Sequence, residues 1–141
     1  MNNFEFKDNS AKAIKAIKAQ VEKGLTESSM LVKSEAQSLA PVDEGNLKRS
    51  IDYELDTDGD EMISKVGAQA EHAPFVEKGT GLFAENGNGR KTPWVYQRPD
   101  GEFRSTTGMK PQPFLEPAFK NSKTRVKSIM ENSMRGVKFW W

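Results

Sequence analysis

The chain has 141 residues, of which 35% are hydrophobic and 29% charged, and its formal net charge is +1. This is the composition of a folded protein, and the length predicts a single domain spanning residues 1–141. No apolar run approaches the roughly 18 residues of a membrane span, and the first residues lack the order of a signal peptide. The absence of cysteine excludes disulfides, thiol nucleophiles and thiolate metal sites. We therefore expect a protein made in the cytoplasm, without membrane contact.

The near-neutral net charge hides a segregated pattern. Residues 41–71 hold nine acidic residues against three basic ones, whereas residues 118–141 hold six basic residues against one acidic residue. Such asymmetry suits contact with an oppositely charged partner surface, including a second copy of the chain. Two solvated faces that differ in sign explain the pattern equally well at this stage.

The first element expected is a long helix over residues 11–40. Asp8, Asn9 and Ser10 offer capping side chains before it, and Pro41 ends it. Gly24 costs about 1 kcal/mol relative to alanine and suggests a bend. The predicted inward stripe comprises Ile14, Ile17, Val21, Leu25, Ser28, Val32 and Leu39.

An antiparallel hairpin is expected next. Its strands would cover residues 47–55 and 61–69, around an Asp- and Gly-rich turn at 56–60. Apolar residues alternate with acidic ones in the first strand, which places on one face Ile51, Tyr53 and Leu55.

The turn of this hairpin resembles the start of a calcium-binding loop in the spacing of Asp56, Asp58 and Asp60. However, Gly59 precedes the third aspartate, and Gly67 stands where the twelfth-position glutamate would be. We therefore expect a solvated turn and no metal site.

The centre of the chain is expected to anchor the rest. Pro74 favours a single helical turn, with Phe75 and Val76 docked on the core. Gly79 and Gly81 provide the backbone freedom with which the chain leaves this turn.

A long excursion then spans residues 82–107. Loops of this length are usually functional, so we expect the functional surface there. A smaller hairpin is predicted inside it, because residues 94–98 and 102–106 flank a Pro-Asp-Gly turn signature. Trp94 and Tyr96 would share one face of the first strand, with Phe103 pairing across.

The last helix is predicted to open at Phe114 and to end at Gly136. Its inward stripe would contain Leu115, Ala118, Phe119, Ser122, Val126, Ile129 and Ser133. The terminal aromatic residues, which include Trp140 and Trp141, would dock either on the same chain or on a neighbour, and both alternatives remain open.

Enzymatic chemistry finds little support in the sequence. His72 is the single histidine. A catalytic set could be imagined in which His72 acts with Glu77 or Glu71 as the base and Ser50 or Thr80 is the nucleophile. No nucleophile elbow, zinc-binding helix or phosphate-binding loop accompanies these residues. We expect no catalytic site, no cofactor and no bound metal.

Three ordered motifs carry a family resemblance: Pro41–Ile51, His72–Thr80 and Gly108–Ala118. Set between a long first helix and a last helix, they resemble the tail-component family of tailed bacteriophages named after phage HK97 gene product 10. The resemblance implies an α+β fold. It would consist of an antiparallel sheet packed by the long N-terminal helix and the C-terminal helix, with a protruding central loop or hairpin.

The resemblance also implies a structural virion protein at the head–tail junction, acting in tail completion, termination or joining. Such proteins form rings, commonly hexamers, that are assembled in the cytoplasm of the bacterial host. The expected partners are other copies of the chain, the tail tube protein and the head connector or stopper protein, with non-specific DNA contact in the lumen. The residues expected at the subunit interface are Glu77, Thr80, Phe83, Arg90, Trp94, Tyr96, Arg98, Phe103, Arg104, Trp140 and Trp141.

A nucleic-acid-binding protein is the alternative interpretation. The last helix and the C-terminus combine positive charge with aromatic side chains that could stack on bases. The basic residues concerned are Lys120, Lys123, Arg125, Lys127, Arg135 and Lys138.

Overall fold

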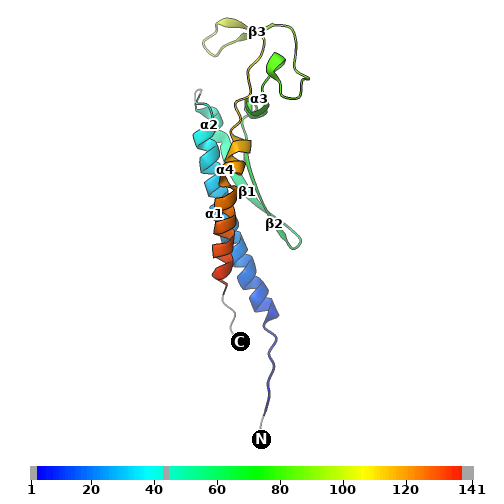
Figure 1. Ribbon diagram of the computed structural model, residues 1–141, viewed down its shortest axis with the longest axis vertical. Helices are drawn as coiled ribbons and strands as arrows, with labels where there is room; N and C mark the ends of the chain where they lie inside the picture. Colours follow the sequence, from blue (N-terminus) through cyan, green and yellow to red (C-terminus); the bar gives the residue numbers. More distant parts are fainter. Residues whose placement is uncertain (1–2, 43–44, 138–141) are drawn as a thin grey trace.

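The computed structural model describes residues 3–42 and 45–137 (Figure 1). In chain order its elements are α1 (Ser10–Leu39), α2 (Asn46–Ser50), β1 (Ile51–Asp58), β2 (Glu61–Ala68), α3 (Ala73–Lys78), the 3₁₀ turn η1 (Gly81–Phe83), β3 (Trp94–Gln97), β4 (Phe103–Thr106) and α4 (Leu115–Arg135). α1 and α4 lie side by side in opposite directions, the β1–β2 hairpin lies beside α1, and the segment with β3 and β4 forms an arm at one end. The predicted α+β class, with its long first and last helices, is confirmed.

Small residues bring α1 and α4 close together. A Cβ at Gly24 would lie 2.8 Å from the sulfur of Met130 and 2.8 Å from Oγ of Ser133. Gly24 therefore admits the partner helix, and α1 continues through it. The buried residues of the two helices are Gly24, Ser28, Ser29, Val32, Ala36, Ala118, Ser122 and Ser133.

Three residues of the predicted inward stripes are exposed instead: Ile14, Leu39 and Phe119. The end of α4 lies next to Gln20, so the first turns of α1, with Ile14, extend beyond the partner helix. Leu39 lies in the last turn of α1. Phe119 is 47% exposed because the fully buried Ala118 and Ser122 occupy the inward face of α4.

The β1–β2 hairpin pairs antiparallel from Ile51 opposite Ala68 to Asp58 opposite Glu61. The face that carries Ile51 turns toward α1, where Ser64 and Ser29 are hydrogen-bonded through their hydroxyl groups. The predicted strand over 47–55 is wrong at its start, because residues 46–50 form α2. Leu47 and Ile51 are both buried and lie four positions apart, a spacing that one helical turn brings to the same side.

The core sits where the C-terminal half of α1 meets α2, α3 and the start of α4. Its buried apolar residues are Val32, Ala36, Ala40, Leu47, Ile51, Ala73, Val76, Phe114 and Ala118. Val76 docks there as predicted, but Phe75 is 56% exposed. The short α3 presents Ala73 and Val76, three positions apart, to the core, and this turns Phe75 outward.

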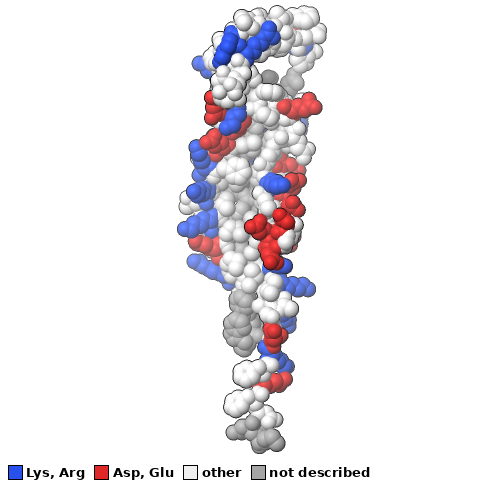
Figure 2. Space-filling view, turned by 90° about the vertical axis from the view of Figure 1, so that its right-hand side faces the viewer, with Lys and Arg blue, Asp and Glu red and all other residues white. Residues whose placement is uncertain are grey.

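The segregated charge of the sequence is visible on the surface of the body (Figure 2). Lys and Arg side chains recur along its left margin, where α4 lies, and Asp and Glu side chains gather right of centre, over the β1–β2 hairpin. Within the described residues, no helix is long and apolar enough to cross a membrane.

Candidate functional site

The arm is clamped to the body through the buried side chain of Glu77. Its carboxylate accepts main-chain N–H groups from Phe114 at 2.8 Å, Leu115 at 3.0 Å and Glu116 at 2.9 Å. These are the first N–H groups of α4, which lack acceptors within the helix, and Phe114 provides no side-chain cap. A carboxylate at this position also interacts favourably with the positive end of the helix dipole. Glu77 on α3 therefore caps a helix that begins 38 residues later.

The two ends of the excursion are joined by main-chain hydrogen bonds. Thr80 N–H donates to the carbonyl of Met109 at 2.9 Å, and Met109 N–H donates to Oγ1 of Thr80 at 2.9 Å. Leu82 N–H donates to the carbonyl of Thr107 at 2.9 Å. The departing and returning chains thus lie side by side, which fixes the direction in which the arm leaves the body.

Two glycines allow this close pairing. Gly81 has φ +60° and Gly108 has φ +125°, values that L side chains rarely adopt. A Cβ at Gly81 would collide with the carbonyl oxygen of Thr107, and one at Gly108 would collide with that of Thr80. Gly81 was predicted to give the chain this freedom, and the structure adds the close approach of the opposite backbone as a second requirement.

The arm has its own internal contacts. Lys78 forms an ion pair with Glu85 at 3.4 Å, and Glu85 N–H donates to the carbonyl of Lys78 at 2.8 Å. Farther out, the guanidinium of Arg90 lies 5.8 Å from the centroid of the Trp94 ring, within cation–π range. These contacts hold the loop between η1 and β3 against the base of the arm.

The predicted small hairpin is confirmed as β3 and β4. Tyr96 lies opposite Arg104 and Gln97 lies opposite Phe103. Directly opposed residues share a face, so Phe103 lies on the side of Val95, and the predicted pairing of Phe103 across from Trp94 and Tyr96 is wrong. Each strand is one residue shorter at the turn than predicted, so residues 98–102 connect them, and Gly101 N–H donates to the carbonyl of Arg98 at 2.9 Å.

Most of the residues predicted for the subunit interface lie along this arm. Exposed there are Phe83, Arg90, Tyr96, Arg98, Phe103 and Arg104. Trp94 is half-buried beside Arg90, whereas Glu77 and Thr80 are engaged at the base within the protomer. Trp140 and Trp141 lie outside the described residues. Val95, which was not among the residues predicted for the interface, is 65% exposed on the same face as Phe103.

A pocket of about 640 Å³ lies between α3 and the loop of the arm. Its wall includes the exposed ring of Phe75 and the stacked pair of Arg90 and Trp94. Phe75, which was predicted to be in the core, instead adds apolar surface at the base of the arm.

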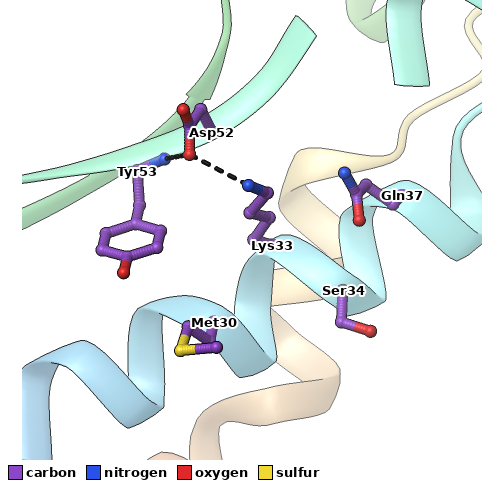
Figure 3. A pocket seen from close by; sticks show the side chains of 6 residues that line it. All are labelled: Met30, Lys33, Ser34, Gln37, Asp52 and Tyr53. Carbon is purple, nitrogen blue, oxygen red and sulfur yellow. Dashed lines mark hydrogen bonds and ion pairs between the residues drawn. The ribbon is translucent and has the colours of Figure 1, made fainter. Parts of the chain in front are cut away.

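A second pocket lies between α1 and β1 and is lined by Met30, Lys33, Ser34, Gln37, Asp52 and Tyr53 (Figure 3). The Lys33 ammonium pairs with Asp52 at 3.0 Å and lies 6.0 Å from the Tyr53 ring centroid. The hydrogen bond from the main-chain N–H of Tyr53 is the largest single cause that lowers the pKa of Asp52. The hydrogen bond and the positive charge of Lys33 lower it further. This carboxylate is engaged in holding the hairpin on α1, which is a structural task.

The proposed catalytic alternatives are not brought together. His72 is exposed at the start of α3, where its carbonyl accepts N–H groups from Phe75 and Val76. Its neighbour Glu77 turns away toward α4. In the described part of the chain, no group of three or more His, Asp or Glu side chains is arranged to hold a metal ion.

The sequence matches the family model described as "Bacteriophage HK97-gp10, putative tail-component" over residues 4–79, more than half of the chain. The chain belongs to the HK97 gp10 family of phage tail components. The match covers α1, α2, the β1–β2 hairpin and α3, and it ends at Gly79, where the arm begins. No curated protein and no solved structure matched the sequence. Membership in the HK97 gp10 family makes this a structural component of the phage virion.

Proposed function

We propose that the protein acts at the head–tail junction, where copies of it assemble into a ring that completes the tail and joins it to the head. Its partners are further copies of itself, the tail tube protein and the head connector or stopper protein. It works by binding, without catalysis and without a cofactor. The ring is a hexamer in this proposal, which follows from the family resemblance.

The observation that carries the proposal is an arm fixed at its base and exposed at its tip. Glu77 and the Thr80–Met109 pairing hold the base. The tip presents Phe103 with 69%, Val95 with 65% and Tyr96 with 45% of their surfaces exposed. Exposed aromatic and apolar side chains on a firmly held support are typical of contact surfaces. A heterologous contact made by such an arm on the next subunit can close into a ring.

The decisive test is removal of the gene from the phage that encodes it. We expect particles whose heads and tails fail to join, or whose tails have uncontrolled length, as counted by electron microscopy. Supplying the protein from a plasmid should restore infectivity. Fully infectious particles without any source of the protein would refute the assignment.

The nucleic-acid alternative is not supported by a specific observation. Lys120 pairs with Glu116 at 2.8 Å and Arg125 pairs with Glu35 at 2.5 Å, so part of the basic charge is already matched within the protomer. Retardation of duplex DNA that weakens with added salt would favour this alternative.

A further inference from the structure

The outward face of the β1–β2 hairpin is acidic. Ser64 contacts Ser29 of α1, which identifies the face with Ser64 as the inner one. Side chains alternate along a strand, so the residues between the inner ones point away from the body. Asp52, at the start of this face, pairs with Lys33 of α1. The remaining exposed charged residues on the outer face and in its turn are five carboxylates and one ammonium group: Glu54, Asp56, Asp58, Asp60, Glu61 and Lys65.

The outward face of α4 carries a basic stripe, defined by Lys120, Lys123 and Lys127. All three side chains are exposed, and their three- and four-residue spacing places them on one side of the helix. Lys120 pairs with Glu116 on the same helix, whereas Lys123 and Lys127 form no ion pair with any described residue. Phe119, next to this stripe, exposes 47% of its surface and provides an apolar anchor.

The two surfaces match in sign and in length. Three carboxylates at alternate positions of β1, from Glu54 to Asp58, span about 13 Å. Three lysines from 120 to 127 span about 10.5 Å along the helix axis. The outer face of the hairpin also carries Ile63, which is half-buried and lies opposite Asp56, as an apolar counterpart for Phe119.

The two surfaces lie on different sides of one protomer. In Figure 2 the acidic hairpin lies right of centre and the basic margin along α4 lies at the left. They therefore meet only between copies, in a head-to-tail contact that uses a different surface on each subunit. Contacts of this kind close into rings when the rotation from one copy to the next closes.

We propose that the acidic outer face of the β1–β2 hairpin of one copy docks on the basic stripe of α4 of the next copy. This contact sets the orientation of each copy relative to its neighbour in the ring. The inference rests on the proposed ring and adds a second contact to that of the arm. A nucleic acid on the basic stripe would leave the acidic hairpin unmatched, whereas a second copy matches both surfaces. Because the contact is electrostatic at an exposed surface, added salt weakens it.

Charge reversal tests this contact. One variant carries Glu54→Lys, Asp56→Lys and Asp58→Lys, and a second carries Lys120→Glu, Lys123→Glu and Lys127→Glu. Each alone should associate at least about tenfold more weakly than the wild type, as measured by light scattering at low salt with and without tail tube protein. A chain with both sets of substitutions should regain association, and so should an equimolar mixture of the two variants.

The matched control reverses three exposed lysines elsewhere, with Lys12→Glu, Lys15→Glu and Lys18→Glu at the start of α1. This control should associate like the wild type, and thermal unfolding should show that every variant is folded.

Undiminished association of the two reversed variants, or no recovery in the doubly reversed chain, would overturn the docking while leaving the ring intact. Absence of any wild-type ring, on the tail tube or alone, would instead overturn the proposed function. Loss of DNA retardation by the α4 variant with unchanged association would assign the stripe to nucleic acid and overturn the docking.

Discussion

At the scale of single residues, the attachment of the arm depends most on Glu77. Its two carboxylate oxygens accept three main-chain N–H groups at the start of α4, and its side chain is buried. Charge-assisted hydrogen bonds at a helix N-terminus are stronger than neutral ones. When the acceptor is removed, the buried N–H of Phe114 and the part-buried N–H groups of Leu115 and Glu116 lose their partner.

We expect Glu77→Ala to lower the free energy of unfolding by about 3 kcal/mol, because three N–H groups lose their acceptor. Glu77→Gln keeps one carbonyl acceptor and should cost less. The control is Glu85→Ala, whose exposed ion pair with Lys78 should contribute less than about 1 kcal/mol. Urea unfolding measures all three. Equal effects of the changes at Glu77 and Glu85 would contradict the capping role.

A second residue, Asp52, makes the hairpin sensitive to acid. Because the N–H of Tyr53 and then Lys33 hold the pKa of Asp52 below its ordinary 3.8, the folded chain favours its charged form. This stabilisation is present above the ordinary pKa and is lost as the pH falls through the lowered one. Between about pH 5 and pH 2, the melting temperature should therefore fall less for Asp52→Asn than for the wild type. The control is Asp58→Asn, because Asp58 lies in the same strand and has no ion pair among the described residues. Its melting temperature should change with pH as that of the wild type does. Identical curves for all three chains would contradict the prediction.

At the scale of elements, the α1–α4 pair is built from small residues and carries two unsatisfied polar groups. The hydroxyls of Ser28 and Ser122 are buried and have no hydrogen-bond partner in the described part of the protein. A buried hydroxyl without a partner costs free energy relative to a methyl group of similar size. The helix pair is therefore less stable than its close packing would allow.

Ser122→Ala should raise the free energy of unfolding by about 1 kcal/mol more than Ser128→Ala, because only Ser122 is buried. Both changes bring the same gain in helix propensity, about 0.5 kcal/mol, so the exposed Ser128 isolates the effect of burial. Chemical denaturation of the two variants gives the comparison. Destabilisation by Ser122→Ala would show that the hydroxyl has an acceptor.

At the scale of the whole molecule, the protein divides its tasks between a body and an arm. The body contains the core, and the arm leaves it through a base in which Leu82 N–H and the carbonyl of Thr107 are 2.9 Å apart. None of the buried residues of the core lies between Val76 and Phe114, although Met109 at the base of the arm packs against them. The arm thus adds surface to the protein without being required for the burial of its core.

Replacing residues 83–106 with a short Gly-Ser linker should leave a cooperatively folded body, because the linker joins two chain ends that are already neighbours. The same chain should fail to form rings with tail tube protein, because it lacks the exposed aromatic tip. Thermal unfolding and light scattering test the two halves of this prediction. Loss of the thermal transition would show that the arm belongs to the folded core, and retained rings would place the subunit contact elsewhere.

Local signals were enough to predict most elements of the protein. The extent of α1, the turn of the small hairpin at Gly101, and the short α3 that contains Pro74 each follow from residues within a few positions of one another. The family resemblance was also carried by short motifs: Pro41–Ile51 lies within the matched region, and His72–Thr80 lies within it except for its last residue. Sequence reasoning failed where burial decides between neighbours, as when α2 replaced the start of a strand and when Phe75 and Phe119 turned outward.

The sequence by itself therefore determined most of the secondary structure, the charge segregation and the family, because propensities, turn chemistry and charge are properties of adjacent residues. Only the tertiary structure decided that Glu77 caps α4, and that Gly24, Gly81 and Gly108 admit close neighbours. It also decided that the acidic hairpin and the basic stripe lie on different sides of the body. These facts depend on distances between segments far apart in the chain, and such distances are fixed only when the whole core packs.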